Sequence, residues 1–475
     1  MELEKFDIKA LVAEVARKLK EEERKGASLS SMEKELERKD KGIFEDPSEA
    51  VEAAFTTQKK FFEMSLSDRK RITDAIKGHL KKYVRELSVL AVEETGMGNV
   101  EDKVIKNTVA IDKTPSTEDL RAGVFTGDDG LTLLELSPFG VIGAITPSTN
   151  PTETVICNSI GMLAAGNAVV FSPHPGAYHA SNRAVELINE AIAMAGGPKH
   201  LVVSIDHPTL KKSEVVMGHK KINLLCATGG PGLVKAVLSS GKKAIGAGAG
   251  NPPVLVDATA NIEKAAKDIV DGASFDHNLP CIAEKEAIVV DEVFDYLVFN
   301  MKKHGAYEIT DPQMIQKLVR LLVPEKWKPN KEFIGKSAKV ILKAVGIEAP
   351  EDTRLIIMET EKDHPFVIEE LMMPVLPLVR VKDAKEGIDL AVKVEHGFRH
   401  TAICHSRDIE VLTEMGHRIQ TTIFVKNGPS FAGIGVGGEG YTTFTIAGPT
   451  GEGLTSASTF TRKRRCALVG GFTIR

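Results

Sequence analysis

We expect an α/β protein of more than one domain, and three observations predict it. Short apolar segments alternate with helix-like segments along most of the chain, a pattern typical of parallel sheets covered by helices. The chain has 475 residues, too many for one compact core, so two or three domains are expected. Its composition, 42% hydrophobic and 27% charged, is that of an ordinary globular protein.

The charge balance and the apolar runs exclude two kinds of partner. A formal net charge of −4 gives no reason to expect a nucleic acid or an acidic membrane surface. The longest apolar runs, such as "LLELSPFGVIGAITP", are interrupted by Pro, Gly and charge well before ~20 residues, so we expect no membrane-spanning helix.

The cysteines and the N-terminus indicate a reduced, cytoplasmic protein. Five cysteines without a CxxC or CxxH pair predict neither a disulfide framework nor a zinc site. The first 20 residues carry charges throughout and lack a continuous apolar segment, unlike a secretory signal peptide.

Residues 1–20 nevertheless have a pattern of their own. The charged stretch that follows, residues 21–41, has little to bury and is typical of a linker. Residues 1–20 are therefore either a first helix packed on the body or a tethered amphipathic helix that docks on a partner, and the linker favours the second at least as strongly. The apolar residues recur at helical spacing and form one stripe: Ile8, Leu11, Val12, Val15 and Leu19.

The body of the chain begins at Gly42. Helical patterns at 47–65 and 66–98 precede a hairpin-like segment at 123–140. Apolar strand segments then alternate with helices, which predicts a parallel sheet. The strands are "GVIGAITP", "NAVVFSP", "HLVVSI" and "INLLCAT", and the helices are "TETVICNSIGMLAAG" and "YHASNRAVELINEAIAMAG".

A second α/β block extends from about Pro253 to Thr422. Its strand segments are "EAIVV", "TRLIIMET" and "PVLPLVRV", and its clearest helix is "AKEGIDLAVKVE". The tail, "TRKRRCALVGGFTIR", ends in alternating apolar residues with little of its own chain to pair with. We expect it to form a strand that is added to a neighbouring subunit.

One cysteine is a candidate nucleophile. A thiolate nucleophile needs partial access and surroundings that stabilise the anion. Cys281 follows "HNLP" on an expected loop, just before a strand. The other four cysteines lie in apolar segments and are predicted to be small buried residues: Cys157, Cys226, Cys404 and Cys466.

Six stretches, taken together, resemble the aldehyde dehydrogenase superfamily. More narrowly, they are similar to the CoA-acylating aldehyde dehydrogenases of bacterial microcompartments, of the propionaldehyde and acetaldehyde types. The similarity covers nearly everything from Gly42 to Arg475. In chain order the stretches are "GVIGAITPSTNPTETVICNSIGMLAAGNAVVFSPHPGA", "CATGGPGLV", "GAGAGNPPVLVDATA", "SFDHNLPCIAEKE", "EELMMPVLPLVRV" and "VKNGPSFAGIGVGGEGYTTFTIAGPTGEG".

The resemblance implies a domain arrangement. A Rossmann-type NAD-binding domain would comprise residues 42–122 and 138–252, and an α/β catalytic domain with the nucleophilic cysteine would comprise 253–424. A small β arm for oligomerisation would comprise 123–137 and 425–475.

The resemblance also implies two catalytic residues. Cys281 falls at the family's nucleophile, whose thiolate attacks the aldehyde carbonyl to give a thiohemiacetal. Asn150 falls at the oxyanion-hole asparagine, a donor typically contributing ~3 kcal/mol. Without the motif, Asn150 would be an ordinary turn residue before Pro151.

A third set of residues is implied for the cofactor, NAD. Glu370 would bind the nicotinamide ribose, with Glu369 as its rival. A lysine that meets the adenosine ribose in hydrolytic members is replaced here by Ser172, which leaves the choice between NAD and NADP open. Thr228, Gly229 and Gly230 would lie on the short turn that opens a helix facing the cofactor pyrophosphate. The other implied cofactor residues are Pro147, Ser148, Thr149, Pro173 and His174.

The glycine-rich stretch "GAGAGNPP" is not a dinucleotide fingerprint. Its glycines are too close for GxGxxG, and two prolines stand where a helix should follow. Hydrolytic members carry here a glutamate that activates water. Aligned on Pro253, that position is Ala247, and no carboxylate occurs between Lys243 and Val256. Without a general base, water should attack the acyl-enzyme slowly, so we expect a thiol, coenzyme A, as the acceptor.

The leading hypothesis is the reaction aldehyde + NAD⁺ + CoA → acyl-CoA + NADH, catalysed in a microcompartment lumen. The motif "NLPCIAEK" favours propionaldehyde. The alternatives are an acetaldehyde (ethanolamine-type) enzyme, a hydrolytic or semialdehyde dehydrogenase, and a non-catalytic scaffold. The implied partners are a shell protein, bound through residues 1–20, and further copies of the chain in a homodimer or homotetramer.

Overall fold

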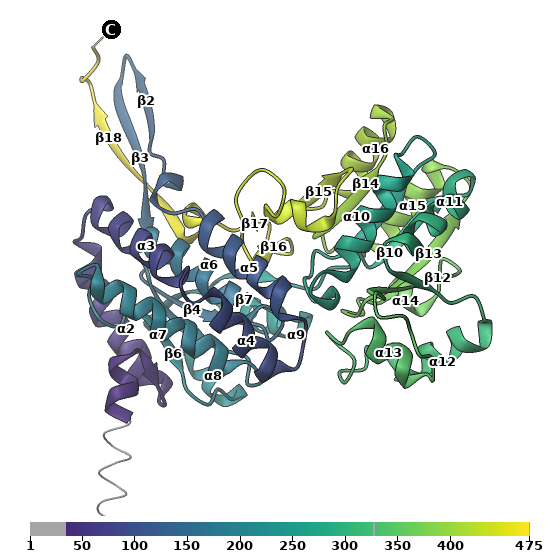
Figure 1. The fold of residues 1–475 in the computed structure, drawn as a ribbon. Helices are drawn as coiled ribbons and strands as arrows, with labels where there is room; N and C mark the ends of the chain where they lie inside the picture. Colours follow the sequence, from purple (N-terminus) through teal and green to yellow (C-terminus); the bar gives the residue numbers. More distant parts are fainter. Residues whose placement is uncertain (1–34, 326–327, 475) are drawn as a thin grey trace, which may run out of the picture.

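Two parallel sheets organise the protein in a computed structural model that describes residues 35–325 and 328–474 (Figure 1). The predicted helix at 1–20 and most of the linker lie outside the described residues. The α/β prediction is confirmed, because all strand pairs of both large sheets are parallel.

The first sheet has six strands in the order β1-β6-β5-β4-β7-β8. From β4 the chain moves outward through β5 and β6, then returns to the other side of β4 with β7 and β8. Strand order therefore reverses between β4 and β7, and α/β sheets bind ligands at such a switch point. The strands are β1 (Ile43–Phe44), β4 (Val141–Ile145), β5 (Ala168–Ser172), β6 (Val202–Ile205), β7 (Ile222–Thr228) and β8 (Lys243–Ala247).

Helices α2 to α9 pack around this sheet (Figure 1). Every residue of α6 is buried, as expected of a helix that is apolar on most sides. The helices are α2 (Pro47–Phe62), α3 (Leu66–Leu80), α4 (Val84–Thr95), α5 (Val100–Lys113), α6 (Pro151–Ala164), α7 (Tyr178–Met194), α8 (Leu210–Gly218) and α9 (Pro231–Leu238).

Helix α8 lies between two strands that the sequence interpretation left consecutive. Its only buried residue is Val216, so it lacks the apolar stripe that predicts a helix. It begins instead on a local signal, since the Thr209 side chain accepts a hydrogen bond from the Lys212 backbone N–H.

The second sheet has seven strands in the order β11-β12-β13-β10-β9-β14-β15. Its strands are β9 (Pro253–Val256), β10 (Glu286–Val290), β11 (Ala306–Glu308), β12 (Leu355–Glu359), β13 (Val375–Val381), β14 (Thr401–His405) and β15 (Ile423–Lys426). Its helices are α10 (Ile262–Ser274), α11 (Asp291–Lys303), α12 (Pro312–Leu322), α13 (Ala338–Ala344), α14 (Pro365–Ile368), α15 (Ala384–Val394) and α16 (Ile409–Ile419).

Short elements complete the chain. They are four 3₁₀ turns, η1 (Thr117–Asp119), η2 (Phe275–Asn278), η3 (Ser430–Ile434) and η4 (Ala457–Phe460), and a small hairpin of β16 (Ile446–Ala447) and β17 (Gly453–Leu454). Among the described residues, no helix is long and apolar enough to cross a bilayer.

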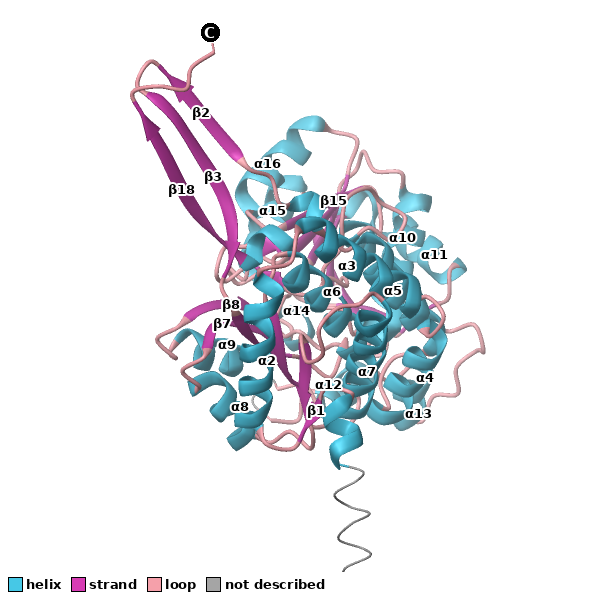
Figure 2. Cartoon of the chain, turned by 90° about the vertical axis from the view of Figure 1, so that its left-hand side faces the viewer, coloured by secondary structure: helices cyan, strands magenta, loops and turns pink. Residues whose placement is uncertain are grey.

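A three-stranded antiparallel arm projects from the body (Figures 1 and 2). The predicted hairpin is confirmed as β2 (Gly123–Gly127) and β3 (Gly130–Pro138). The prediction for the tail is wrong, because β18 (Thr461–Val469) pairs with β3 of its own chain along nine residue pairs. The hairpin left one edge of β3 unpaired, and β18 fills it.

The arm also corrects the prediction for Cys466. This cysteine was expected to be buried, but it is exposed on β18. A ribbon that stands away from the body packs neither of its faces on a core, so an apolar run there does not imply burial. Cys157, Cys226 and Cys404 are buried as predicted.

Candidate active site

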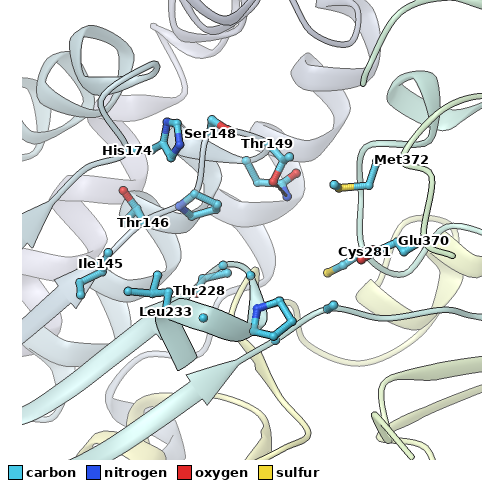
Figure 3. Close-up of a pocket in the computed structure, with 18 of the residues that line it drawn as sticks. Ile145, Thr146, Ser148, Thr149, His174, Thr228, Leu233, Cys281, Glu370 and Met372 are labelled. Carbon is cyan, nitrogen blue, oxygen red and sulfur yellow. Dashed lines mark hydrogen bonds between the residues drawn. The ribbon is translucent and has the colours of Figure 1, made fainter. Parts of the chain in front are cut away.

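A pocket of about 1130 Å³ lies at the switch point of the first sheet and extends to the loop before β10 of the second (Figure 3). The segments after β4, β5 and β7 form one wall. The segments around Cys281 and Glu370 form the opposite end, well separated in Figure 3 from His174.

Nearly all the predicted site residues line this pocket. They are Pro147, Ser148, Thr149, Asn150, Pro173, His174, Thr228, Gly229, Gly230, Cys281 and Glu370. Ser172 does not reach it. Ser172 is fully buried, and its Oγ lies 2.8 Å from the Oγ of Ser213, which does line the pocket. As the last residue of a central strand, Ser172 points into packed protein.

The loop that carries Cys281 is held in an unusual backbone conformation. Asp276, His277 and Asn278 all have positive φ, between 47° and 65°, a region that Asp, Asn and His enter more readily than other non-glycine residues. The Asn278 amide braces the loop by donating to the carbonyls of Ala273 (2.8 Å) and Glu284 (2.9 Å). Cys281 is partly exposed and lines the pocket.

The surroundings of Cys281 do not favour its anion overall, contrary to the expectation for a nucleophile. Burial and the nearby carboxylate of Glu370 raise the pKa of the Cys281 thiol to about 12, although the charge of Lys285 acts in the opposite direction. Burial likewise raises the pKa of Glu370 to about 7, against the charge of Lys285. At neutral pH the ligand-free protein therefore holds a thiol rather than a thiolate at Cys281.

Asn150 stands at the N-terminus of α6 with its amide oxygen occupied. Lys106 Nζ donates to Asn150 Oδ1 at 2.7 Å. The amide nitrogen donates to Thr149 Oγ1 at 3.2 Å. A carboxamide nitrogen carries two N–H groups, so the second remains available to a ligand at the pocket wall.

The N-terminus of α9 suits an anionic group. Its N-cap is Gly230, and no side chain caps the helix, so its first N–H groups are left to other partners. A Cβ at Gly230 or Gly232 would meet nothing within 4 Å. This part of the pocket therefore has both the donors and the space for a dinucleotide diphosphate.

The glycine-rich stretch lies beside the nucleophile. A Cβ at Gly250 would lie 2.9 Å from the carbonyl oxygen of Cys281 and 2.9 Å from Cγ of His400, so only glycine fits there. Gly248 and Ala249 line the pocket, whereas Ala247 ends β8 and is buried.

Sequence reasoning missed three residues near the pocket. Lys328 and Lys331 line it, and neither has an ion-pair partner in the described part of the chain. Charged residues in a polar loop carry no signal that separates them from solvated ones. His400 is buried behind Gly250, and burial together with the charge of Lys285 lowers its pKa to about 4. Its Nε2 has no hydrogen-bond partner among the described residues.

One trio outside the pocket could in principle share a metal ion. Glu45, Asp206 and His207 lie close together. However, Arg38 pairs with Asp206, and Lys212 pairs with Glu45. The charge of the trio is therefore already compensated, and nothing connects it to the pocket.

Comparison with known proteins identifies the family. The model of the aldehyde dehydrogenase family matches residues 30–445. This chain belongs to the aldehyde dehydrogenase family. The resemblance found in the sequence is thereby confirmed, and so is the fold.

Within the aldehyde dehydrogenase family, several relatives are similar over nearly the whole chain. A propanal dehydrogenase (CoA-propanoylating) of Salmonella typhimurium is 51% identical over 92% of this chain and 94% of its own length. An acetylating acetaldehyde dehydrogenase, EutE, of Escherichia coli is 45% identical over 98% and 99%.

Solved structures agree with the sequence relatives. The propionaldehyde dehydrogenase of Rhodopseudomonas palustris, with bound CoA and an acylated cysteine, is 58% identical with a TM-score of 0.90, covering 92% of this chain and 100% of that one. A propionaldehyde dehydrogenase from the fucose utilisation microcompartment of Clostridium phytofermentans is 51% identical with a TM-score of 0.90, covering 91% and 100%.

The charge of Glu370 should govern the reactivity of Cys281. In the cofactor-free protein, Glu370→Gln removes a negative charge and should lower the pKa of the Cys281 thiol. We expect iodoacetamide to alkylate Cys281 ~3- to 10-fold faster at pH 8, because one pKa unit changes the thiolate fraction tenfold. The difference should vanish below about pH 6, where the Glu370 carboxyl is already protonated.

The rate is measured by mass spectrometry in a Cys466→Ser background, which removes the exposed thiol. Glu369→Gln is the matched control and should leave the rate unchanged. Slower alkylation of Glu370→Gln would instead show that Glu370 accepts the thiol proton.

Proposed function

We propose that this protein oxidises a short-chain aldehyde to its acyl-CoA with reduction of NAD⁺, and that propionaldehyde is the preferred substrate. One observation carries the acylating reaction: a pocket cysteine lies beside a stretch, 243–256, that contains no carboxylate to activate water. The names of the CoA-propanoylating and acetylating relatives support it.

The pocket fits a dinucleotide cofactor. Residues 228–230 and the uncapped start of α9 would hold its diphosphate, and Glu370 would bind the nicotinamide ribose. When bound, the nicotinamide supplies the acceptor for the hydride that leaves the substrate carbon. The unpaired Lys328 and Lys331 add positive charge to a pocket that must admit two anionic ligands, NAD or NADP and coenzyme A.

The chain's own residues perform the covalent steps. The Cys281 thiol gives its proton to solvent water in the open pocket, and the charge of Lys285 stabilises the thiolate. The thiolate attacks the aldehyde carbon, and the carbonyl electron pair moves onto oxygen to give a thiohemiacetal anion. The free N–H of Asn150 and the backbone N–H of Cys281 donate to that oxygen.

The acyl group then leaves as a thioester of coenzyme A. Collapse of the oxyanion, with loss of hydride from the same carbon, leaves an acyl thioester on Cys281. The coenzyme A thiolate attacks this carbonyl carbon, and the Cys281 thiolate is the leaving group. Apolar side chains near the nucleophile suit a short alkyl chain: Leu279, Ile282, Ile434 and Phe444.

The reaction is tested by the dependence of NADH formation on coenzyme A. With propionaldehyde and NAD⁺, we expect sustained turnover only when coenzyme A is present and an acyl-CoA product by mass spectrometry. Cys281→Ala should abolish this activity while NAD⁺ binding is retained, because the side chain performs the covalent step. Equal rates with and without coenzyme A would contradict the proposal.

The same assay with C2, C3 and C4 aldehydes compares kcat/KM. The highest value for acetaldehyde would favour the ethanolamine-type alternative. Turnover that yields free acid would favour a hydrolytic or semialdehyde dehydrogenase. Parallel measurements with NADP⁺ determine cofactor preference.

A carboxylate at the position aligned with the glutamate of hydrolytic family members should shift the product. Ala247→Glu is expected to increase free acid formed with NADH when coenzyme A is absent, because it supplies a candidate base for water. Ala247→Gln has the same size without the base and is the control. If Ala247→Glu folds and acylates Cys281 yet gives no more acid than Ala247→Gln, this position does not correspond to the family's glutamate.

We also propose that residues 1–20 bind a microcompartment shell protein, that the enzyme resides in the lumen, and that the β arm joins copies into a homodimer or homotetramer. The apolar stripe and the charged linker support the first point. The microcompartment origin of a relative supports the second. Exposed apolar residues on the arm support the third: Val124, Phe125, Leu468 and Val469.

The N-terminal segment should serve packaging and not chemistry. Deletion of residues 1–20 should leave kcat unchanged within about twofold and abolish co-sedimentation with assembled shells, since the segment is joined through a linker with little to bury. The pair Leu11→Glu and Val15→Glu should act like the deletion. Arg17→Glu, on the opposite face of the predicted helix, should not. A melting temperature lowered by several degrees in the deletion would instead show that the helix packs on the body.

A further inference from the structure

We propose that Lys106 is a positioning residue that fixes the orientation of the Asn150 carboxamide, so that its N–H and not its oxygen faces the reacting carbonyl. The inference rests on the proposed function, in which Asn150 stabilises the oxyanion. Lys106 lies on α5, outside every motif that the sequence analysis singled out.

Lys106 is an ammonium enclosed by protein. Its side chain is 0% exposed, and its Nζ contacts three oxygens: Asn150 Oδ1 at 2.7 Å, Asp276 Oδ2 at 2.6 Å and Glu153 Oε1 at 3.1 Å. An ammonium has three N–H donors and no acceptor; the contact with Asn150 is a hydrogen bond, and those with Asp276 and Glu153 are ion pairs. Burial alone lowers the pKa of Lys106, but the charges of Asp276 and Glu153 outweigh burial and raise it. Lys106 is therefore charged at any pH where the enzyme works.

A permanent donor decides which way the neighbouring amide lies. The oxygen and nitrogen of a carboxamide have nearly the same shape, so packing alone distinguishes the two orientations poorly. An ammonium can only donate, so it forms a hydrogen bond with the oxygen of Asn150 and cannot form one with the amide nitrogen. The amide nitrogen then lies on the side away from Lys106. One of its N–H groups donates to Thr149 Oγ1, and the other remains free for the substrate oxygen. A flipped amide would direct its oxygen at the developing oxyanion and repel it.

The same ammonium connects the oxyanion donor to the loop of the nucleophile. Asp276 begins the left-handed turn that leads to Cys281. Its Oδ1 accepts the backbone N–H of Asn99 at 2.9 Å, and its own N–H donates to Asp102 at 2.7 Å. The turn is thus fixed on α5, and Lys106 holds Asn150 on the same helix. The distance between donor and nucleophile is set by one rigid element.

The adjacent lysine on this face offers a matched control. Lys103 is 1% exposed, and its Nζ contacts Asp276 Oδ2 at 3.0 Å and the Thr149 carbonyl at 3.4 Å. It shares Asp276 with Lys106 and is equally buried, yet it does not contact the Asn150 side chain. Lys106→Met and Lys103→Met therefore each remove one buried lysine from the same cluster, and only the first frees the Asn150 amide.

The experiment compares these two variants for CoA-dependent turnover of propionaldehyde. Lys106→Met should lower kcat by about 10- to 100-fold, approaching the loss expected from removing an oxyanion donor, with KM for NAD⁺ little changed. Lys103→Met should change kcat by less than about threefold, if melting temperatures are matched. Lys106→Gln keeps an N–H donor and should recover part of the loss.

Two further measurements separate positioning from a structural effect. Alkylation of Cys281 by iodoacetamide builds up no oxyanion. The charge of Lys106 favours the Cys281 thiolate less than that of Lys285 does, so Lys106→Met should slow alkylation far less than it lowers kcat. In an Asn150→Ala background, Lys106→Met should cause no further loss of kcat, because no amide remains to orient. If Lys106→Met does not fold, the series is repeated with Glu153→Gln added, which removes the buried carboxylate whose ion pair with Lys106 is lost.

The outcomes discriminate between the inference and the function on which it rests. A wild-type protein without CoA-dependent turnover overturns the proposed function. Normal wild-type turnover with equal losses in Lys103→Met and Lys106→Met, or with additive losses of Lys106→Met and Asn150→Ala, overturns the role of Lys106 alone.

Discussion

Two lysines and two carboxylates are buried together at the junction of α5, α6 and the turn before Cys281, and their mutual compensation is the constraint on which the site depends. Lys103, Lys106, Glu153 and Asp276 are all essentially inaccessible. A charge removed from water is tolerated only when it is paired and hydrogen-bonded. Each charged group therefore restricts the positions of its partners, and with them the positions of the backbone segments that carry them. The apolar cores of the two sheets set the approximate position of this junction, and Lys106 links Asn150 to the turn before Cys281 through Asp276.

The sequence predicts the parts of the site that depend on local chemistry. A helix start such as Thr228–Gly–Gly, a cysteine after a polar turn, and a glycine stretch without a carboxylate each have a signature within a few residues. The parts that it missed depend on contacts distant in the chain. Lys106 looks like an ordinary solvated lysine until Asp276, 170 positions later, is folded against it. The pairing of β18 and the exposure of Cys466 have the same origin, since a strand pattern does not name its partner.

The state of the nucleophile follows from its surroundings. Burial and Glu370 keep the Cys281 thiol protonated at rest, against the charge of Lys285. A thiol is far less susceptible than a thiolate to oxidation and stray electrophiles. An enzyme that acts on reactive aldehydes benefits from a protonated cysteine, because side reactions then modify the cysteine less before substrate binds.

The pairing of β18 with β3 leaves one strand edge of the projecting arm uncovered until late in translation. Strand β3 ends at Pro138, but its outer edge is covered only by β18, which ends at Val469. On the ribosome, both α/β sheets can condense while that edge still lacks its partner, since the residues that cover it are translated after the strands of both sheets. Pairing β18 with β3 also closes a long loop, and the entropic cost of that closure delays the pairing. The complete three-stranded arm can therefore form only after Val469 has been translated. A chain that terminates before β18 exposes the unpaired edge of β3, the kind of surface that protein quality control recognises.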